Sequence, residues 1–185
     1  AQDELVRLPG PEAKSLILSD HPAHASSVVY RYAPLAGVRF RAALRNAGED
    51  HLFWIELARA ARQVVISPRA SAGRHDDGIN MFTGAMGWDN PGMVGILTSV
   101  LAKYRLLEAE PDLAGPDMPL VRARRRASQD QIAFIILRGA LKRPAGLASA
   151  WSRVTSADPS AGAWFLPAMA RALAARALGR FEIVF

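Results

Sequence analysis

Cysteine is absent from this chain of 185 residues, and its absence removes several chemistries at once. No disulfide, thiol nucleophile, iron–sulfur cluster or thiolate zinc site can form without it. Long apolar runs are missing too. The longest, Ile132–Leu137, is far shorter than the ~20 residues that a helix needs to cross a bilayer. The sequence therefore predicts a protein without a transmembrane segment.

The common catalytic signatures are also missing from the sequence. It contains no Gly-x-x-x-x-Gly-Lys-Ser/Thr loop for nucleotide phosphates and no Gly-x-Gly-x-x-Gly turn for a dinucleotide. It contains neither a Gly-x-Ser-x-Gly elbow nor a His-Glu-x-x-His helix. Because each chemistry needs that spacing to hold phosphate, nucleophile or metal, the sequence predicts no cofactor, although it leaves other enzyme classes open.

Lysine is scarce, and the positive charge comes almost entirely from arginine. Arginine supplies 20 of the 23 basic residues, which together with the abundant alanine is typical of a GC-rich bacterial genome. The charge is also skewed along the chain, since residues 120–185 contain eleven basic and three acidic side chains. A surface with such an excess attracts anions.

Two segments in the first quarter of the chain alternate in the manner of strands. Residues 26–32 place valine and tyrosine on alternate positions, and residues 38–45 place apolar side chains on one face and arginines on the other. With the proline- and glycine-containing turn between them, they predict a β-hairpin at about 26–45 with one basic face. Residues 181–185 predict a short terminal strand.

Apolar residues spaced three or four apart predict helices over 51–66, 90–108 and 129–141, followed by further helices up to residue 179. The β-branched run Val64–Ile66 either ends the first of these or forms a strand. The helix over 129–141 is apolar on nearly all sides, which predicts that it lies at the centre of the core.

These patterns predict an α+β fold, in which a small antiparallel sheet packs against several helices and the C-terminal part is rich in helix. The length suits a single domain over residues 1–185. The acidic, proline-broken segment 111–119 is the candidate boundary for a subdomain.

Histidine and carboxylate residues offer only a weak case for acid–base or metal chemistry. His21 and His24 form a His-x-x-His pair, but a proline between them disfavours the helix that would align two imidazoles. His75, Asp76 and Asp77 form a compact polar cluster that equally suits a capped turn. We predict no metal site, and we keep these three residues as candidate acid–base groups of an enzyme.

The longest irregular segment, residues 67–90, contains a candidate ligand loop. Trp88 offers a flat surface between glycines, and Asp89 and Asn90 precede a helix whose amino terminus could bind an anion. The alternative is a tight connection whose tryptophan fills the core.

The planar guanidinium group of arginine can donate two parallel hydrogen bonds to phosphate oxygens. The chain has two arginine-rich strips that could bind an anionic partner in this way. The alternative is internal pairing with the acidic residues Glu108, Glu110, Asp112 and Asp117, which precede the first strip. The candidate anion-binding residues of the two strips are Arg122, Arg124, Arg125, Arg126, Arg39, Arg41 and Arg45.

Apolar residues also continue from Ala163 to Leu178 in a stripe flanked by arginines. Core packing is the favoured interpretation, and a partner helix or a membrane-surface helix is the alternative.

Two functional hypotheses follow from these residues. The first is a bacterial interaction protein that docks an acidic protein partner or nucleic acid on its arginines. The second is a small-molecule enzyme or ligand-binding domain with a pocket around residues 67–90. We favour removal of an initiator methionine before Ala1, which would suit a cytoplasmic protein, and the alternative is signal-peptide cleavage, which would suit a secreted or periplasmic one.

Overall fold

The computed structural model describes residues 5–20, 27–44, 47–67, 69, 91–142 and 144–181. Helices make up most of this part of the chain, and the remaining regular structure is one pair of strands. The helices are α1 (Gly10–Ser19), α2 (Glu49–Ala60), α3 (Pro91–Ala109), α4 (Pro111–Ala114), α5 (Met118–Lys142), α6 (Leu147–Ala157) and α7 (Ala161–Ala177), and the strands are β1 (Val6–Pro9) and β2 (Gln63–Ile66). The predicted α+β class and helix-rich C-terminal part are confirmed.

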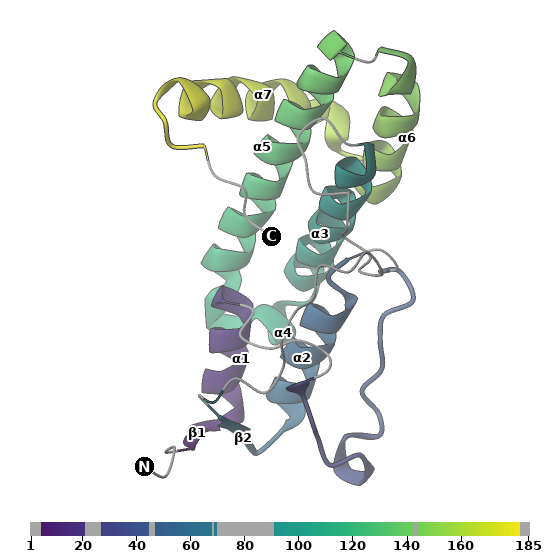
Figure 1. Ribbon diagram of the computed structural model, residues 1–185. Helices are drawn as coiled ribbons and strands as arrows, with labels where there is room; N and C mark the ends of the chain where they lie inside the picture. Colours follow the sequence, from purple (N-terminus) through teal and green to yellow (C-terminus); the bar gives the residue numbers. More distant parts are fainter. Residues whose placement is uncertain are drawn as a thin grey trace.

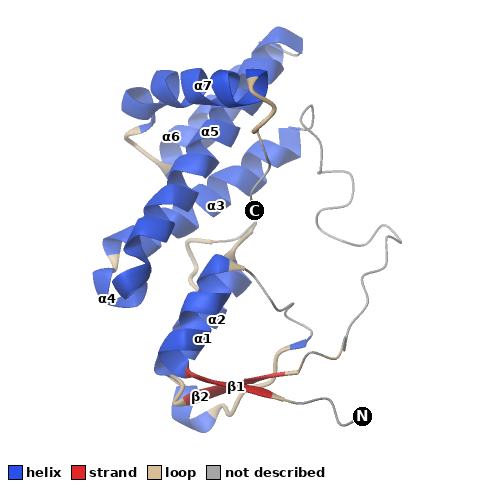
Figure 2. Ribbon diagram, turned by 90° about the vertical axis from the view of Figure 1, so that its left-hand side faces the viewer, coloured by secondary structure: helices blue, strands red, loops and turns tan. Residues whose placement is uncertain are grey.

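The two long helices α3 and α5 pack side by side along the length of the molecule (Figure 1). Helices α1 and α2 pair with each other at one end, where the strands also lie, and α6 and α7 cover the opposite end. Figure 2 shows the same order from a second direction. None of the helices in the described ranges is long and apolar enough to cross a membrane.

The sheet forms from segments that lie far apart in the sequence. β1 pairs with β2 in antiparallel register, with Val6 opposite Ile66 and Pro9 opposite Gln63. The β-branched run at 64–66 is therefore a strand, one of the two options that the sequence leaves open, and α2 ends at Ala60.

The predicted β-hairpin at 26–45 is wrong. Its described residues, 27–44, contain no strand, and a 3-10 turn occupies Ala33–Leu35. The apolar positions instead pack against α2, where Val28, Leu35 and Val38 contact the cluster around Phe53. An alternating pattern needs a partner strand to satisfy its backbone, and this segment has a helix beside it. Of the predicted terminal strand, residues 182–185 lie outside the described part of the chain.

The apolar core has two main clusters, and α3 and α5 contribute to both. The first includes Leu18 of α1, Ile55 of α2 and Leu107 of α3; the second includes Leu97 of α3 and Ile132 of α5. Residues 131–136 of α5 are all buried, as the all-round apolar pattern predicts.

Helix α5 differs from its prediction at both ends. It begins at Met118, eleven residues before the predicted start at 129, and Pro119 stands in its first turn, where a missing N–H has no cost. The arginines that were interpreted as a run before the helix are therefore part of it. At the other end, Leu141 is 79% exposed, so the helix leaves the core before it finishes.

Gly10 joins β1 to α1 at a point where the backbone beyond α2 comes close. A Cβ atom built on it would lie 2.1 Å from the carbonyl oxygen of Ala61, just beyond the end of α2. Its own N–H donates to the carbonyl of Arg62 at 3.3 Å. The strand-to-helix joint therefore requires a residue with no side chain.

Candidate functional site

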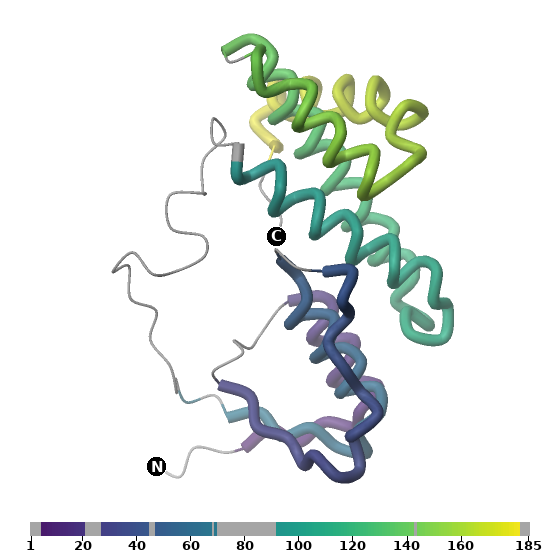
Figure 3. Tube along the Cα trace, turned by 90° about the vertical axis from the view of Figure 1, so that its right-hand side faces the viewer, coloured from purple at the N-terminus to yellow at the C-terminus, as the bar shows by residue number. Residues whose placement is uncertain are grey.

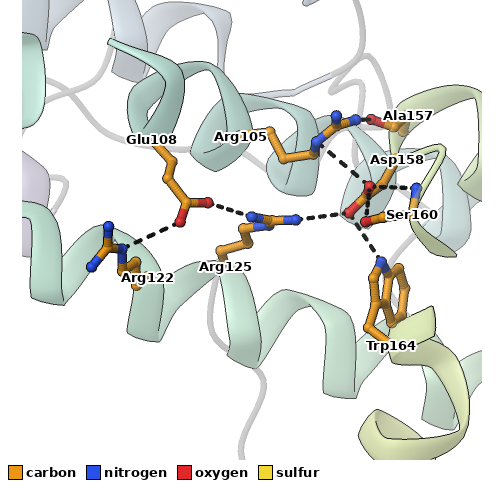
Figure 4. A network of polar contacts seen from close by, with 8 residues as sticks. All are labelled: Arg105, Glu108, Arg122, Arg125, Ala157, Asp158, Ser160 and Trp164. Carbon is orange, nitrogen blue, oxygen red and sulfur yellow. Dashed lines mark hydrogen bonds and ion pairs between the residues drawn. The ribbon is translucent and has the colours of Figure 1, made fainter. Parts of the chain in front are cut away.

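Within α5, three of the predicted anion-binding arginines contact groups of this chain, and the fourth, Arg126, is exposed. Arg122 and Arg125 both donate to the carboxylate of Glu108 on α3, and Arg125 also reaches Asp158 at 3.2 Å (Figure 4). Arg124 donates to the carbonyl of Ser19 at 2.9 Å. These contacts are of the kind that we expect if the arginines pair with groups of the same chain, which is the alternative to binding an anionic partner.

Asp158 lies at the centre of this network, with 0% of its surface exposed. It accepts hydrogen bonds from the backbone and hydroxyl of Ser160 at 3.0 and 2.6 Å and from Trp164 Nε1 at 3.0 Å, and Arg105 lies 3.6 Å away (Figure 4). Burial alone raises the pKa of Asp158, but the Ser160 hydrogen bonds and the charges of Arg105 and Arg125 lower it below its ordinary value. The carboxylate therefore stays ionised and ties α3, α5 and α7 together.

Arg41, from the second predicted strip, is an anchor of the same kind. It lies 2.7 Å from Glu56 of α2 and 3.0 Å from Glu110 after α3, and the Glu56 hydrogen bond raises its pKa. Glu108 and Glu110 lie two residues apart, so both arginine strips meet at the carboxyl end of α3. Arg45 lies outside the described residues.

A group of aromatic and arginine side chains in the segment before α2 is exposed to solvent. It consists of Tyr30, Arg31, Tyr32, Arg39 and Phe40, and we call it the aromatic–arginine surface. Phe40 is 54% exposed and Tyr32 is 59% exposed, whereas large rings are mostly buried in folded proteins. Both arginines are exposed as well.

Two of these rings contact Phe53 of α2, and a third ring contacts Arg39. The ring of Phe40 stacks on Phe53 with centroids 4.2 Å apart, and Tyr30 meets the same ring edge-on at 5.8 Å. Arg39 lies over the Tyr32 ring at 5.8 Å and donates to its hydroxyl at 3.2 Å. The tube in Figure 3 shows residues 27–44 crossing beside α2. Helix α2 therefore supports the rings of Phe40 and Tyr30 on one side, and their other sides are exposed to water.

The electrostatics of this segment are of one sign. Residues 21–48 contain no aspartate or glutamate. Along residues 27–44, Arg41 is neutralised by carboxylates from α2 and the end of α3, so Arg31 and Arg39 supply the open positive charge. Flat rings beside guanidinium groups can hold planar, anionic groups by stacking and charge pairing.

The sequence reasoning missed a second cluster, which is buried. Lys103 of α3 is 2% exposed, and its ammonium group donates to His51 Nδ1 at 2.8 Å. His51 Nε2 in turn donates to the carbonyl of Ile17 at 2.6 Å. Burial lowers the pKa of Lys103 to about 7. The signal was present in the sequence, because position 103 falls on the apolar spacing of its helix between Val100 and Leu107.

The remaining predicted candidates cannot be placed in the fold. His75, Asp76 and Asp77, and the ligand-loop residues Trp88, Asp89 and Asn90, lie outside the described residues. A pocket around residues 67–90 therefore stays a prediction. Among the described residues, no group of three or more histidine, aspartate or glutamate side chains is placed to hold a metal ion.

No protein-family model matches this chain, and no curated protein or solved structure is significantly similar to it. The functional argument therefore depends on the geometry of the chain itself.

Proposed function

We propose that this protein binds single-stranded nucleic acid and that the aromatic–arginine surface is the docking site. The observation that carries the proposal is the exposure of three aromatic rings beside two arginines, with no carboxylate in the segment that presents them. Proteins that bind single strands combine stacking rings with cationic groups that follow the phosphates. An acidic protein partner is the other occupant that the charge would suit, and the test below separates the two.

The rings favour a nucleic acid over an acidic protein surface. Tyr32 and Phe40 leave more than half of their surface in water, which has a free-energy cost that a stacked base would remove. Every base has a flat face of this kind, whereas a carboxylate-rich protein surface has few. Arg31 and Arg39 would then pair with the phosphates on either side of the stacked bases.

Arg122 and Arg126 of α5 support the docking site at longer range. Arg122 shares the single carboxylate of Glu108 with Arg125, and 66% of the Arg122 side chain remains exposed. Because the network pairs the guanidinium groups of Arg105, Arg122 and Arg125 with only two carboxylates, those of Glu108 and Asp158, it keeps an excess of positive charge. That excess would attract a polyanion before the rings engage it.

The test measures fluorescence anisotropy of a labelled oligothymidine and a labelled oligouridine against increasing protein. Binding should weaken steeply as salt rises, because phosphate contacts release condensed counterions. Tyr32→Ala should weaken binding roughly tenfold, since one stacked base is worth about 1–3 kcal/mol, and Tyr32→Phe should preserve it. Arg39→Gln should reduce the salt slope by about one unit.

Arg180→Gln is the matched control, because it removes the same charge from an exposed position beyond α7, at the other end of the molecule. Binding of both oligonucleotides should change little in this variant. The proposal fails if neither oligonucleotide binds at low salt, where electrostatic attraction is strongest. It also fails if a duplex of equal length competes as well as the single strand, because stacking on the rings would then contribute nothing.

A further inference from the structure

Two basic side chains share a buried site between α2 and α3. Lys103 of α3 is 2% exposed and His51 of α2 is 3% exposed, and the lysine Nζ lies 2.8 Å from the histidine Nδ1. On its other side, His51 Nε2 lies 2.6 Å from the carbonyl oxygen of Ile17 in α1. The pair therefore connects three helices, and the proposed docking site uses neither residue.

The hydrogen bonds limit the number of protons that the pair can hold. A carbonyl oxygen only accepts, so His51 Nε2 must carry a hydrogen, and in a neutral imidazole Nδ1 is then an acceptor. Lys103 can donate to Nδ1 whether it is an amine or an ammonium group. A proton on each group would place two hydrogens face to face across 2.8 Å and remove this hydrogen bond. The closed pair therefore accepts one added proton, and a second has no place in it.

The charged groups around the pair do not balance a second proton. Asp50, at the start of α2, favours the protonated form of Lys103, and Arg124 of α5 opposes it. Burial has the largest effect and lowers the pKa of Lys103 to about 7. The Tyr104 ring of α3 lies 4.5 Å from Nζ, and burial raises the pKa of its phenol, so this neighbour stays neutral. One carboxylate therefore faces Arg124 and any proton that the pair takes up.

The surroundings also keep the pair away from water. Gly48 stands before α2 with a φ of +81°, and a Cβ atom built on it would lie 3.0 Å from Cδ of Lys103. Leu52 and Tyr104, the chain neighbours of the pair, both belong to the first apolar cluster. Two positive charges that cannot be hydrated have a large free-energy cost. That cost falls when α2 and α3 separate far enough to admit water.

We propose that the His51–Lys103 pair is an acid-sensitive contact, in which uptake of a second proton moves α2 away from α3 while both remain helical. Histidine is suited to take this proton in mild acid, because its ordinary pKa is ~6.5. The separated form binds the second proton and the closed form does not. Acid therefore favours the separated form, and neutral pH favours the closed one. Helix α1 moves with α2, because the two helices pack against each other.

Spin-label distances measure this movement in a chain that has no cysteine of its own. Labels on Ala60→Cys and Ala123→Cys, both at exposed positions, join α2 to α5, which packs alongside α3. Between pH 8 and pH 5, double electron–electron resonance should show a second, longer distance that gains population below about pH 6.5. This range stays above 3.8, so the Asp158 network keeps its charge. Return to pH 8 should restore the first distance.

His51→Gln is the decisive variant. A glutamine side chain has both a donor and an acceptor, so it can bond to the Ile17 carbonyl and to Lys103, but it does not titrate. In this variant the Ala60→Cys and Ala123→Cys labels should keep the short distance at pH 5.

Ala123→Cys with Ala170→Cys is the control pair of labels. It spans α5 and α7, which the Arg171–Asp130 contact joins at 2.7 Å, and both labelled positions are exposed. Its distance should be the same at pH 8 and pH 5, and far-ultraviolet circular dichroism should show the same helix content at both.

Three results would overturn the proposal. The first is a single α2–α5 distance in the otherwise wild-type chain from pH 8 to pH 5, a result that does not depend on the folding of any His51 variant. The second is a longer distance in His51→Gln with the same midpoint, which would assign the movement to another group. The third is an equal lengthening of the control pair, which would indicate a general expansion of the protein in acid.

Discussion

Lys103 places an ammonium group where the surrounding structure favours an uncharged amine. The side chain lies between His51 and the Tyr104 ring, whose centroid is 4.5 Å from the ammonium nitrogen. Burial lowers the lysine pKa to about 7; Asp50 opposes this change, and Arg124 adds to it. In the unfolded chain the group returns to its ordinary value of 10.5. Folding is therefore linked to deprotonation of this lysine.

The sign of the linkage gives a prediction for Lys103→Met. Between the folded pKa of about 7 and the unfolded 10.5, the unfolded chain binds more protons, so wild-type stability should rise with pH across this window. The rise should be roughly 1.4 kcal/mol for each pH unit. Lys103→Met should remove most of it, as measured by urea unfolding at several pH values. Parallel pH profiles of the two proteins would show that Lys103 keeps its ordinary pKa in the fold.

At the scale of elements, the Asp158 network matters most, because a single buried carboxylate joins groups from α3, α5 and α7. Asp158 follows α6, and its partners belong to α3, α5 and the start of α7. A buried charge that loses its counter-charge has a large cost, whereas an exposed pair is worth little. The free energy of unfolding lost on substitution of Asp158, compared with that lost on substitution of Asp130, tests this difference between buried and exposed pairs.

Asp158→Asn should reduce the free energy of unfolding by about 3–5 kcal/mol, because Arg105 and Arg125 lose a fully buried partner. Asp130→Asn is the control. Burial raises the pKa of Asp130 in spite of Arg171, so this neutral substitution should cost less than about 1 kcal/mol. Denaturant titration at neutral pH measures both. Equal losses in the two variants would contradict the role of Asp158.

The pH dependence of Asp158 has the same sign as that of Lys103, because folding lowers both pKa values, but it falls in the acid range. Its folded pKa is lowered from 3.8, so its stabilisation is present above 3.8 and is lost as pH falls through the folded value. The difference between the wild type and Asp158→Asn should therefore shrink in acid.

The elements also show what the sequence could and could not predict. Helix α3 was predicted at 90–108 and lies at Pro91–Ala109, because its apolar spacing is regular and a proline marks its start. The hairpin prediction was wrong because apolar residues at every second position do not specify which segment a strand pairs with. The partner of β2 is β1, which lies some twenty residues before the predicted hairpin. The start of α5 was missed because its first turns are rich in arginine, and their carboxylate partners come from other elements.

The candidate site, like the elements, could be predicted only in part from the sequence. The sequence places Arg39 and Arg41 together in a basic strip, but it does not show that one is an anchor and the other is exposed. That division depends on Glu56 and Glu110, which reach Arg41 and leave Arg39 open. It is set by tertiary contacts, which local sequence patterns do not encode.

On the scale of the whole molecule, the two apolar clusters share their longest helices. Because α3 and α5 contribute to both, neither end can lose its core without disturbing the helices that support the other. The predicted boundary at 111–119 falls between these helices, in a segment that includes α4.

We therefore expect one cooperative unfolding transition. Leu107→Ala in the first cluster and Ile132→Ala in the second, both 0% exposed, should each move the whole transition by about 2–5 kcal/mol. Far-ultraviolet and near-ultraviolet circular dichroism should give coincident curves in both variants. Two separated transitions, each sensitive to one substitution, would instead support a subdomain boundary at 111–119.

Gly10 gives this architecture an evolutionary signature. Any side chain there would collide with the backbone beyond α2, and the only relief is to separate α1 from α2. Relatives of this chain can differ at many other positions, yet each one that retains this joint must retain this glycine. A glycine followed by proline between a short strand and a helix is therefore the mark by which distant relatives can be recognised.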